Sequence, residues 1–170
     1  MKKNGVFEIT WSEYQSIKAQ VSADPDVFIA EVDGAQIRDP SSFFENILFA
    51  FQAPEKYCKN NNFDSFIDWL GDLEWFKADK YNFTGIYNQY YLAILNQEQV
   101  RGGEPDRRTD YVGCLRGLVY QWTKERHYSL WGAPNRDFTV YLVHGHNVPF
   151  LPDQKLYTWL PPEHKEADFP

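Results

Sequence analysis

Cysteine is scarce in this chain: Cys58 and Cys114 are the only two among 170 residues. Two cysteines are too few for a disulfide framework, which makes a reducing compartment the default. No stretch is long and apolar enough to span a membrane. The lysines near the amino terminus are not followed by the apolar run of a signal peptide. We therefore expect a cytoplasmic protein without a membrane anchor.

Positive charge is also in short supply. Lys and Arg number 17 against 24 Asp and Glu, which gives a net charge of −7. Nonspecific binding to nucleic acids or anionic membranes needs a positive surface, so we expect neither as a direct partner. A basic protein partner suits the negative net charge better. The hydrophobic content of 43% with 18% aromatic residues predicts a folded chain rather than a disordered one.

Apolar runs and turn residues predict an alternation of strands and helices. Strands are expected at 27–32, 81–87 and 138–143. Helices are expected at 11–21, 40–51, 63–73 and 110–122. The segment 89–95 has the pattern of a short helix, with a longer strand as the open alternative.

Helical connections between strands favour parallel pairing with right-handed crossovers. We therefore predict an α/β fold in which a three-stranded parallel sheet is flanked by helices. The predicted domain covers residues 26–145. Residues 1–25 are expected to form an N-terminal extension and residues 146–170 a C-terminal extension.

Three aspartates, Asp64, Asp68 and Asp72, recur every fourth residue. In a helix, side chains four residues apart lie on one face, so the carboxylates would form a single stripe. The apolar residues fall mostly on the other side; they are Phe63, Phe66, Ile67, Leu70 and Leu73. Asn62, the last of three consecutive asparagines, suits the N-cap of this helix. Without further context, such a stripe is typical of a solvated acidic face.

The residues around the stripe supply that context. A family resemblance rests on Asp33-Gly34 and Ile37 after the first strand, the helix at 43–51, Pro54-Glu55-Lys56-Tyr57, the run 63–70, and Asp72-Leu73-Glu74-Trp75. In this order the segments resemble the barstar-like family of intracellular ribonuclease inhibitors. The resemblance covers about residues 26–145 in element order and is most specific between Pro54 and Trp75.

The resemblance implies a stoichiometric inhibitor rather than an enzyme, with no cofactor and no metal. Its expected partner is a ribonuclease or other nuclease toxin with a basic active site, made by the same bacterial cell. In the family, the acidic helix and the preceding loop plug the nuclease active site, and carboxylates stand where substrate phosphates bind. Asp68 matches the dominant contact, Asp64 a second contact on the same face, and Tyr57 a loop aromatic that frames the site.

The physical logic holds without the family. Ribonucleases present arginine, lysine and histidine to a phosphodiester, and a rigid carboxylate forms charge-assisted, often bidentate, hydrogen bonds with such groups. Opposite charges on the two surfaces also speed the encounter. An acidic helix face can therefore imitate the charge of the substrate.

The sequence departs from the family pattern at several positions. Cys58 stands where the family has a glycine, Lys56 where it has a second tyrosine, and Ile67 where its helix has a tryptophan. Two additional residues fall within Asn60-Asn61-Asn62, so we expect the loop to follow its own path. Glu125 is the nearest candidate for the glutamate that the family's last helix contributes. The predicted partner-binding residues are Asp68, Asp64, Tyr57, Asp72, Asn60, Ile67 and Glu125.

Other functions remain open at this stage. The same scaffold could bind a non-nuclease protein, and a hydrolase with paired carboxylates ranks third. Cys58 has no histidine nearby in the predicted fold, so its thiol is expected to be inert. His144-Gly145-His146 offers two metal ligands, fewer than a zinc site needs. We expect a monomer.

Overall fold

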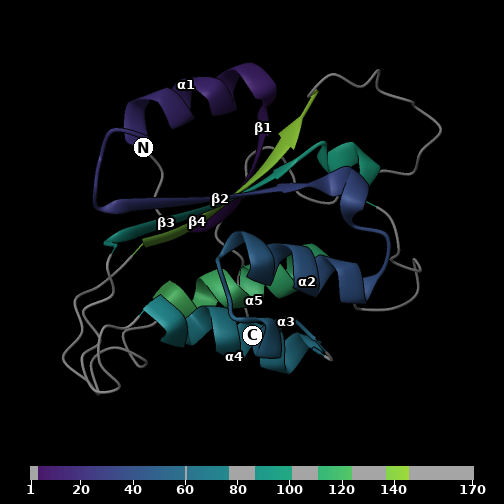
Figure 1. Ribbon diagram of the computed structural model, residues 1–170. Helices are drawn as coiled ribbons and strands as arrows, with labels where there is room; N and C mark the ends of the chain where they lie inside the picture. Colours follow the sequence, from purple (N-terminus) through teal and green to yellow (C-terminus); the bar gives the residue numbers. More distant parts are fainter. Residues whose placement is uncertain (1–3, 60, 77–86, 101–110, 124–136, 146–170) are drawn as a thin grey trace.

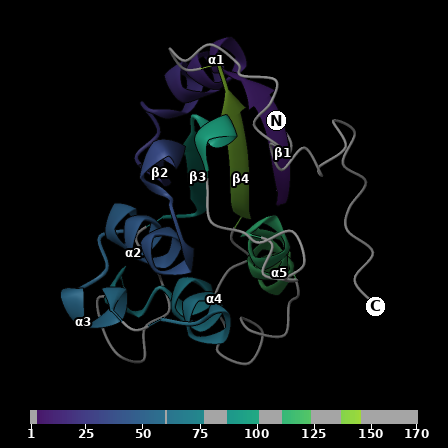
Figure 2. The ribbon, with the colours of Figure 1, turned by 90° about the vertical axis from the view of Figure 1, so that its right-hand side faces the viewer.

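In the computed structural model, residues 4–59, 61–76, 87–100, 111–123 and 137–145 are described. Their central feature is a parallel sheet of four strands (Figure 1), whose order β1-β4-β3-β2 can be followed across the sheet in Figure 2. The strands are β1 (Gly5–Thr10), β2 (Val27–Asp33), β3 (Gln89–Leu95) and β4 (Asp137–His144). The predicted α/β class with a parallel sheet is confirmed, whereas the predicted number of three strands is wrong.

Two strands account for the difference. β1 lies within the segment expected as an N-terminal extension, and it pairs with β4 from Gly5 opposite Thr139 to Thr10 opposite His144. Segment 89–95 is strand β3, so its helical interpretation is wrong and its alternative is right. The strand expected at 81–87 falls outside the described residues, apart from Tyr87. The domain boundary at residue 26 stays a prediction.

The burial of β3 explains why its sequence pattern also fits a short helix. Its five interior residues, from Tyr90 to Ile94, are all buried, because β3 lies between β2 and β4 with helices on both faces. A strand covered on both faces shows no alternation of polar and apolar residues. A short run of buried apolar residues like this one cannot be distinguished from a short buried helix by periodicity.

Helices cover both faces of the sheet. One face carries α1 (Trp11–Val21), and the opposite face carries α2, α4 and α5, as the two perpendicular views agree (Figure 1, Figure 2). The elements of that second layer are α2 (Pro40–Ala50), the short α3 (Glu55–Cys58), α4 (Phe63–Asp72) and α5 (Tyr111–Thr123). Three 3₁₀ turns complete the described elements: η1 (Gly34–Gln36), η2 (Glu74–Phe76) and η3 (Gln97–Gln99). None of the helices within the described ranges is long and apolar enough to cross a membrane.

Aromatic rings fill the core between the sheet and the second layer. Phe51, at the end of α2, stacks on Phe138 of β4 with ring centroids 5.6 Å apart and contacts Phe28 of β2 at 5.5 Å. A smaller cluster lies under α1, where Tyr91 and Tyr141 stack at 5.7 Å. Burial in this cluster raises the pKa of Tyr141 to about 12. The sheet is thus anchored on both faces.

The turn after β2 requires a glycine. A Cβ atom at Gly34 would lie 2.5 Å from the backbone oxygen of Asn96, because the turn after β3 approaches closely there. The Asp33 carboxylate joins the two turns by accepting hydrogen bonds from the Ala35 amide at 3.0 Å and from the Asn96 side chain at 2.9 Å. The predicted Asp33-Gly34 turn is therefore present, and it links the carboxyl ends of β2 and β3.

Two phenylalanines of α2 and its C-cap give a matched test of this core. Replacing the fully buried Phe51 by alanine should lower the free energy of unfolding by about 3–5 kcal/mol, since a cavity replaces its ring contacts with Phe28, Tyr90 and Phe138. Replacing Phe49, which is 78% exposed, by alanine should change the free energy of unfolding by less than about 0.5 kcal/mol. Urea denaturation measures both, and equal losses in the two variants would contradict this arrangement of α2.

Candidate partner-binding site

Helix α4 begins at a fully formed cap. The Asn62 side chain accepts a hydrogen bond from the Ser65 amide at 2.8 Å, and the Ser65 hydroxyl accepts one from the Asn62 amide at 3.0 Å. This reciprocal pair satisfies two amides that the first helical turn leaves without partners. Asp64 follows in the first turn, where its negative charge is favourable to the helix dipole. The predicted cap at Asn62 is confirmed.

The apolar side of α4 is held by two neighbouring helices. Phe66 is fully buried, with its ring 5.3 Å from Phe43 and 5.1 Å from Phe44 of α2. Leu70 is also fully buried, and its carbonyl accepts a hydrogen bond from the indole of Trp122 on α5 at 3.2 Å. These contacts fix the rotation of α4 about its own axis.

That rotation leaves the first two aspartates of the helix in solvent. Asp64 and Asp68 are exposed and lie one helical turn apart on the same face of α4. Asp72 belongs to the same helix, but its side chain lies outside the described part of the chain. Ile67 is half-buried and points toward α5, where its Cδ1 would lie 3.5 Å from a Cβ atom at Gly117. The roles of these four residues in binding stay predictions.

Helix α3 places Tyr57 against α4. The Tyr57 ring is half-buried and meets Trp69 of α4 edge to face at 4.7 Å and Trp75 of η2 at 5.4 Å. The Trp75 indole donates to the Phe51 carbonyl at 2.8 Å, which ties the group to the end of α2. The Lys56 ammonium lies 4.5 Å from the centroid of the Tyr57 ring. Tyr57 therefore serves the packing between α3 and α4, where it contacts Trp69, the residue that follows Asp68.

Trp69 is the residue of this surface that the sequence did not reveal. It directly follows Asp68 and is half-buried, and its principal partner Tyr57 lies twelve positions earlier in another element. Helical periodicity relates residues within α4 and carries no information on contacts with α3. A search for aromatic residues beside the aspartates would have found it.

The segment that connects α3 to α4 turns without left-handed backbone at Cys58. Positive φ angles among the described non-glycine residues occur at Asn4, Gln52, Leu73 and Asn96. Cys58 instead ends the short helix α3, and its thiol donates to the carbonyls of Ala53 and Pro54. The Asn61 side chain donates to the Tyr57 carbonyl at 2.5 Å. Two predicted binding residues, Asn60 and Glu125, lie outside the described residues.

The charges of α3 are partly paired among themselves. Glu55 and Lys59 form an ion pair one turn apart, and this hydrogen bond lowers the pKa of Glu55 and raises that of Lys59. Burial raises the pKa of the Cys58 thiol, and the charges of Glu45 and Glu55 add to the effect. Cys58 is therefore a protonated thiol near neutral pH, which makes it a poor nucleophile.

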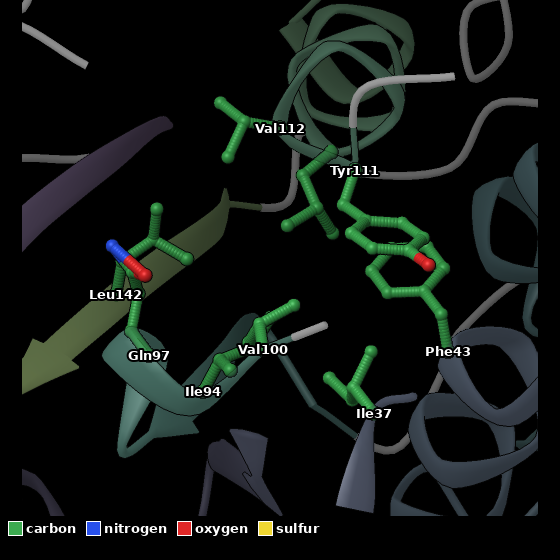
Figure 3. A pocket seen from close by; sticks show the side chains of 9 residues that line it. Ile37, Phe43, Ile94, Gln97, Val100, Tyr111, Val112 and Leu142 are labelled. Atoms are coloured by element: carbon green, nitrogen blue, oxygen red, sulfur yellow. The ribbon is translucent and has the colours of Figure 1, made fainter. Parts of the chain in front are cut away.

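An apolar cavity is present in the core, and no residue of α4 lines it (Figure 3). It has a volume of about 20 Å³ and is lined by Ile37, Phe43, Ile94, Gln97, Val100, Tyr111, Val112, Leu115 and Leu142. A cavity of this size holds about one water molecule, so it cannot take an organic substrate. In the ranges that the structure describes, no group of three His, Cys, Asp or Glu side chains is placed to hold a metal ion.

The cap of α4 can be tested without touching the aspartates. Asn62→Ala should lower the free energy of unfolding by about 1 kcal/mol, because the Ser65 amide loses its acceptor. Asn62→Asp keeps a capping oxygen and should retain most of the stability. Thermal denaturation of the two variants distinguishes the cap from a general effect of substitution. Equal stability of Asn62→Ala and the wild type would contradict a stabilising role of the Asn62 cap.

The state of Cys58 predicts a pH profile. Alkylation by iodoacetamide requires the thiolate, so the raised pKa should move the midpoint of the rate profile of Cys58 above that of the same residue in the urea-unfolded chain. Any alkylation that remains in the Cys58→Ser variant comes from Cys114. A midpoint below that of the unfolded chain would mean that the thiol is activated.

Comparison with known proteins agrees with this geometry. The family model described as Barstar (barnase inhibitor) matches residues 27–142, which is more than half of the chain. The match spans β2, all of α2 to α5, and most of β4. Searches of the curated proteins and of the solved structures returned no match. The parallel sheet, the second layer containing the acidic helix, and the extent of the match lead to one conclusion: the chain belongs to the barstar family.

Proposed function

We propose that this protein is an inhibitor or immunity protein that binds a ribonuclease toxin made by the same bacterial cell. It occludes the nuclease active site with the exposed side of α4 and the adjoining α3. The observation that carries the proposal is the exposed pair Asp64 and Asp68 on a helix whose other side is fixed to the core of a barstar-family fold.

Rigidity supports this role. α4 is capped by Asn62 and buried through Phe66 and Leu70, so its carboxylates are held in place before the partner arrives. A preorganised surface loses less conformational entropy on binding than a flexible one. The carboxylates can then form charge-assisted hydrogen bonds with the arginine, lysine or histidine side chains of a nuclease active site.

The surroundings of the aspartates also suit a protein interface. Tyr57, Trp69 and Trp75 are half-buried, Tyr57 packs against both tryptophans, and Trp69 directly follows Asp68. Aromatic side chains next to charged groups are typical of the residues that contribute most to protein association. In this arrangement Asp68 makes the strongest contact, Asp64 the second, and Tyr57 and Ile67 border the footprint, with Asp72, Asn60 and Glu125 as further contacts.

A stoichiometric inhibitor needs no catalytic group of its own. The exposed carboxylates act by occupying positions where substrate phosphates would bind, and no bond is made or broken by this chain. The net charge of −7 speeds the encounter with a basic nuclease. This effect weakens as salt screens the charges.

One observation favours a second candidate, a non-nuclease partner for the same scaffold. Lys56 lies on α3 and Lys59 directly follows it, so the combined surface of α3 and α4 carries both signs of charge. A partner with acidic as well as basic groups would complement it. Capture from the native host by the immobilised full chain, with the eluted proteins identified, separates the two candidates.

Neutral substitutions of the aspartates test the leading proposal. Asp68→Asn should weaken binding to the ribonuclease encoded beside this gene by more than about 2 kcal/mol, roughly 30-fold, because a buried cation of the partner loses its counter-charge. Asp64→Asn should cause a smaller loss. Asp26→Asn, at an exposed aspartate outside α3 and α4, should leave the affinity within about threefold. Calorimetry or inhibition of RNA cleavage measures all three.

Circular dichroism serves as the folding control for these variants. Each substitution replaces an exposed carboxylate by an amide of equal size, so the spectra should be unchanged. Wild-type affinity in both Asp68→Asn and Asp64→Asn would overturn the proposal. So would an affinity that stays constant when the salt concentration is raised several-fold.

A further inference from the structure

Three titratable side chains meet at the side of the sheet where β1, β4 and β3 end. His144 is the last residue of β4, Glu8 lies in β1, and Glu98 lies in η3 directly after β3. The Nε2 atom of His144 is 3.7 Å from Glu8 Oε1, and its Nδ1 atom is 3.7 Å from Glu98 Oε2. One imidazole ring therefore lies between two carboxylates that come from different elements.

The Glu98 carboxylate is buried and Glu8 is half-buried, and neither carboxylate is completely satisfied. Glu98 is 6% exposed, and only its Oε1 atom accepts a hydrogen bond, from the Gly145 amide at 3.2 Å. Glu98 Oε2 and Glu8 Oε1 are buried atoms without a hydrogen-bond partner. A buried carboxylate oxygen without a donor is costly. These two oxygens are the ones that face the two nitrogens of His144.

The chemistry of imidazole connects the two carboxylate oxygens that lack a hydrogen-bond donor. A neutral imidazole has one N–H group and one lone pair, so it can serve one carboxylate and must turn the lone pair toward the other. A protonated imidazole has an N–H group on each nitrogen and a positive charge. Only the protonated ring can satisfy Glu8 and Glu98 together, after small side-chain rotations that shorten both contacts.

We propose that Glu8, His144 and Glu98 form a proton-dependent clamp that holds β1 and η3 to the end of β4. The clamp is closed when the imidazole is protonated and both carboxylates are ionised. It opens when the ring loses its proton, because one carboxylate then faces a lone pair.

Helix α5 packs over β1 and β4 on the face to which Glu8 and His144 belong by strand alternation. Its one charged side chain is Arg116, and among the described residues no ion pair joins Arg116 to the clamp. The other titratable side chains of α5 are the phenols of Tyr111 and Tyr120 and the thiol of Cys114, which are residue types that titrate above histidine. The clamp thus sets one cation between two anions.

The sign of the pH effect follows from the protonated ring. The clamp contributes stability while the imidazole is protonated and both carboxylates are ionised, and it loses that contribution when a rise in pH removes the proton from the ring. It is also lost at strongly acidic pH, where the carboxylates are neutralised. Raising the pH from 6 to 8 should therefore weaken the attachment of β1.

The clamp is independent of the proposed nuclease-binding face. Glu8 and His144 both lie outside the matched family region, residues 27–142, and β1 is the strand added at that edge of the sheet. The device therefore fastens an additional N-terminal strand to the family fold through a contact between β1, β4 and η3.

The test compares urea unfolding of the full chain at pH 6 and pH 8. Between these values the unfolding equilibrium constant of the wild type should rise about tenfold more than that of His144→Gln or Glu8→Gln, since neither variant can form the clamp. Asp26→Asn, an exposed carboxylate outside the cluster, should follow the wild type. Parallel pH dependence in the wild type and the two clamp variants would overturn the proposal.

A second measurement needs no destabilising substitution. The ¹⁵N chemical shifts of the His144 imidazole in the wild type at pH 6, assigned by their loss in His144→Gln, should show a proton on both nitrogens. A neutral tautomer at this pH would overturn the clamp. So would an increase in thermal stability on adding Zn²⁺ at pH 8 that is absent in His144→Gln, because it would identify the cluster as a metal site.

Discussion

Phe66 and Leu70 hold α4 against α2 and α5, and this contact decides where the carboxylates of the helix point. Both side chains are fully buried, and Trp122 adds a hydrogen bond to the Leu70 carbonyl. A helix fixed through one face must present the opposite face to solvent. Asp64 and Asp68 are therefore exposed because of packing beneath them, and their alignment costs little since each remains solvated. The position of the acidic face is a consequence of the core.

The second constraint is the contact of α3 with α4. Tyr57 bridges Trp69 and Trp75, and the Trp75 indole is hydrogen-bonded to the end of α2. This chain of contacts makes the segment before the acidic helix part of the same rigid unit, even though α3 itself is only one turn long. The charges of α3 and α4 are thus presented together. For a surface that recognises another protein, such preorganisation favours both affinity and specificity.

Local signals in the sequence were sufficient for the elements that depend on local interactions. Asn62 caps α4 as expected, and the apolar spacing of α4 placed its buried face correctly. β3 could not be assigned with certainty, because burial on both faces removes its periodicity. β1 was missed since it is a short edge strand whose pairing with β4 joins residues more than 130 positions apart. For the same reason, the contact between Tyr57 and Trp69 depends on how α3 packs against α4 and has no local signature.

The central claim is that the exposed side of α4 occupies a nuclease active site in place of substrate phosphates. Competition with a non-cleavable dinucleotide tests it most directly, because the dinucleotide fills the active site without being consumed. The apparent dissociation constant between this protein and the nuclease should rise in proportion to the dinucleotide concentration once the active site is saturated. An apparent dissociation constant that stays constant as dinucleotide is added would contradict the account, since both ligands would then bind the nuclease at the same time.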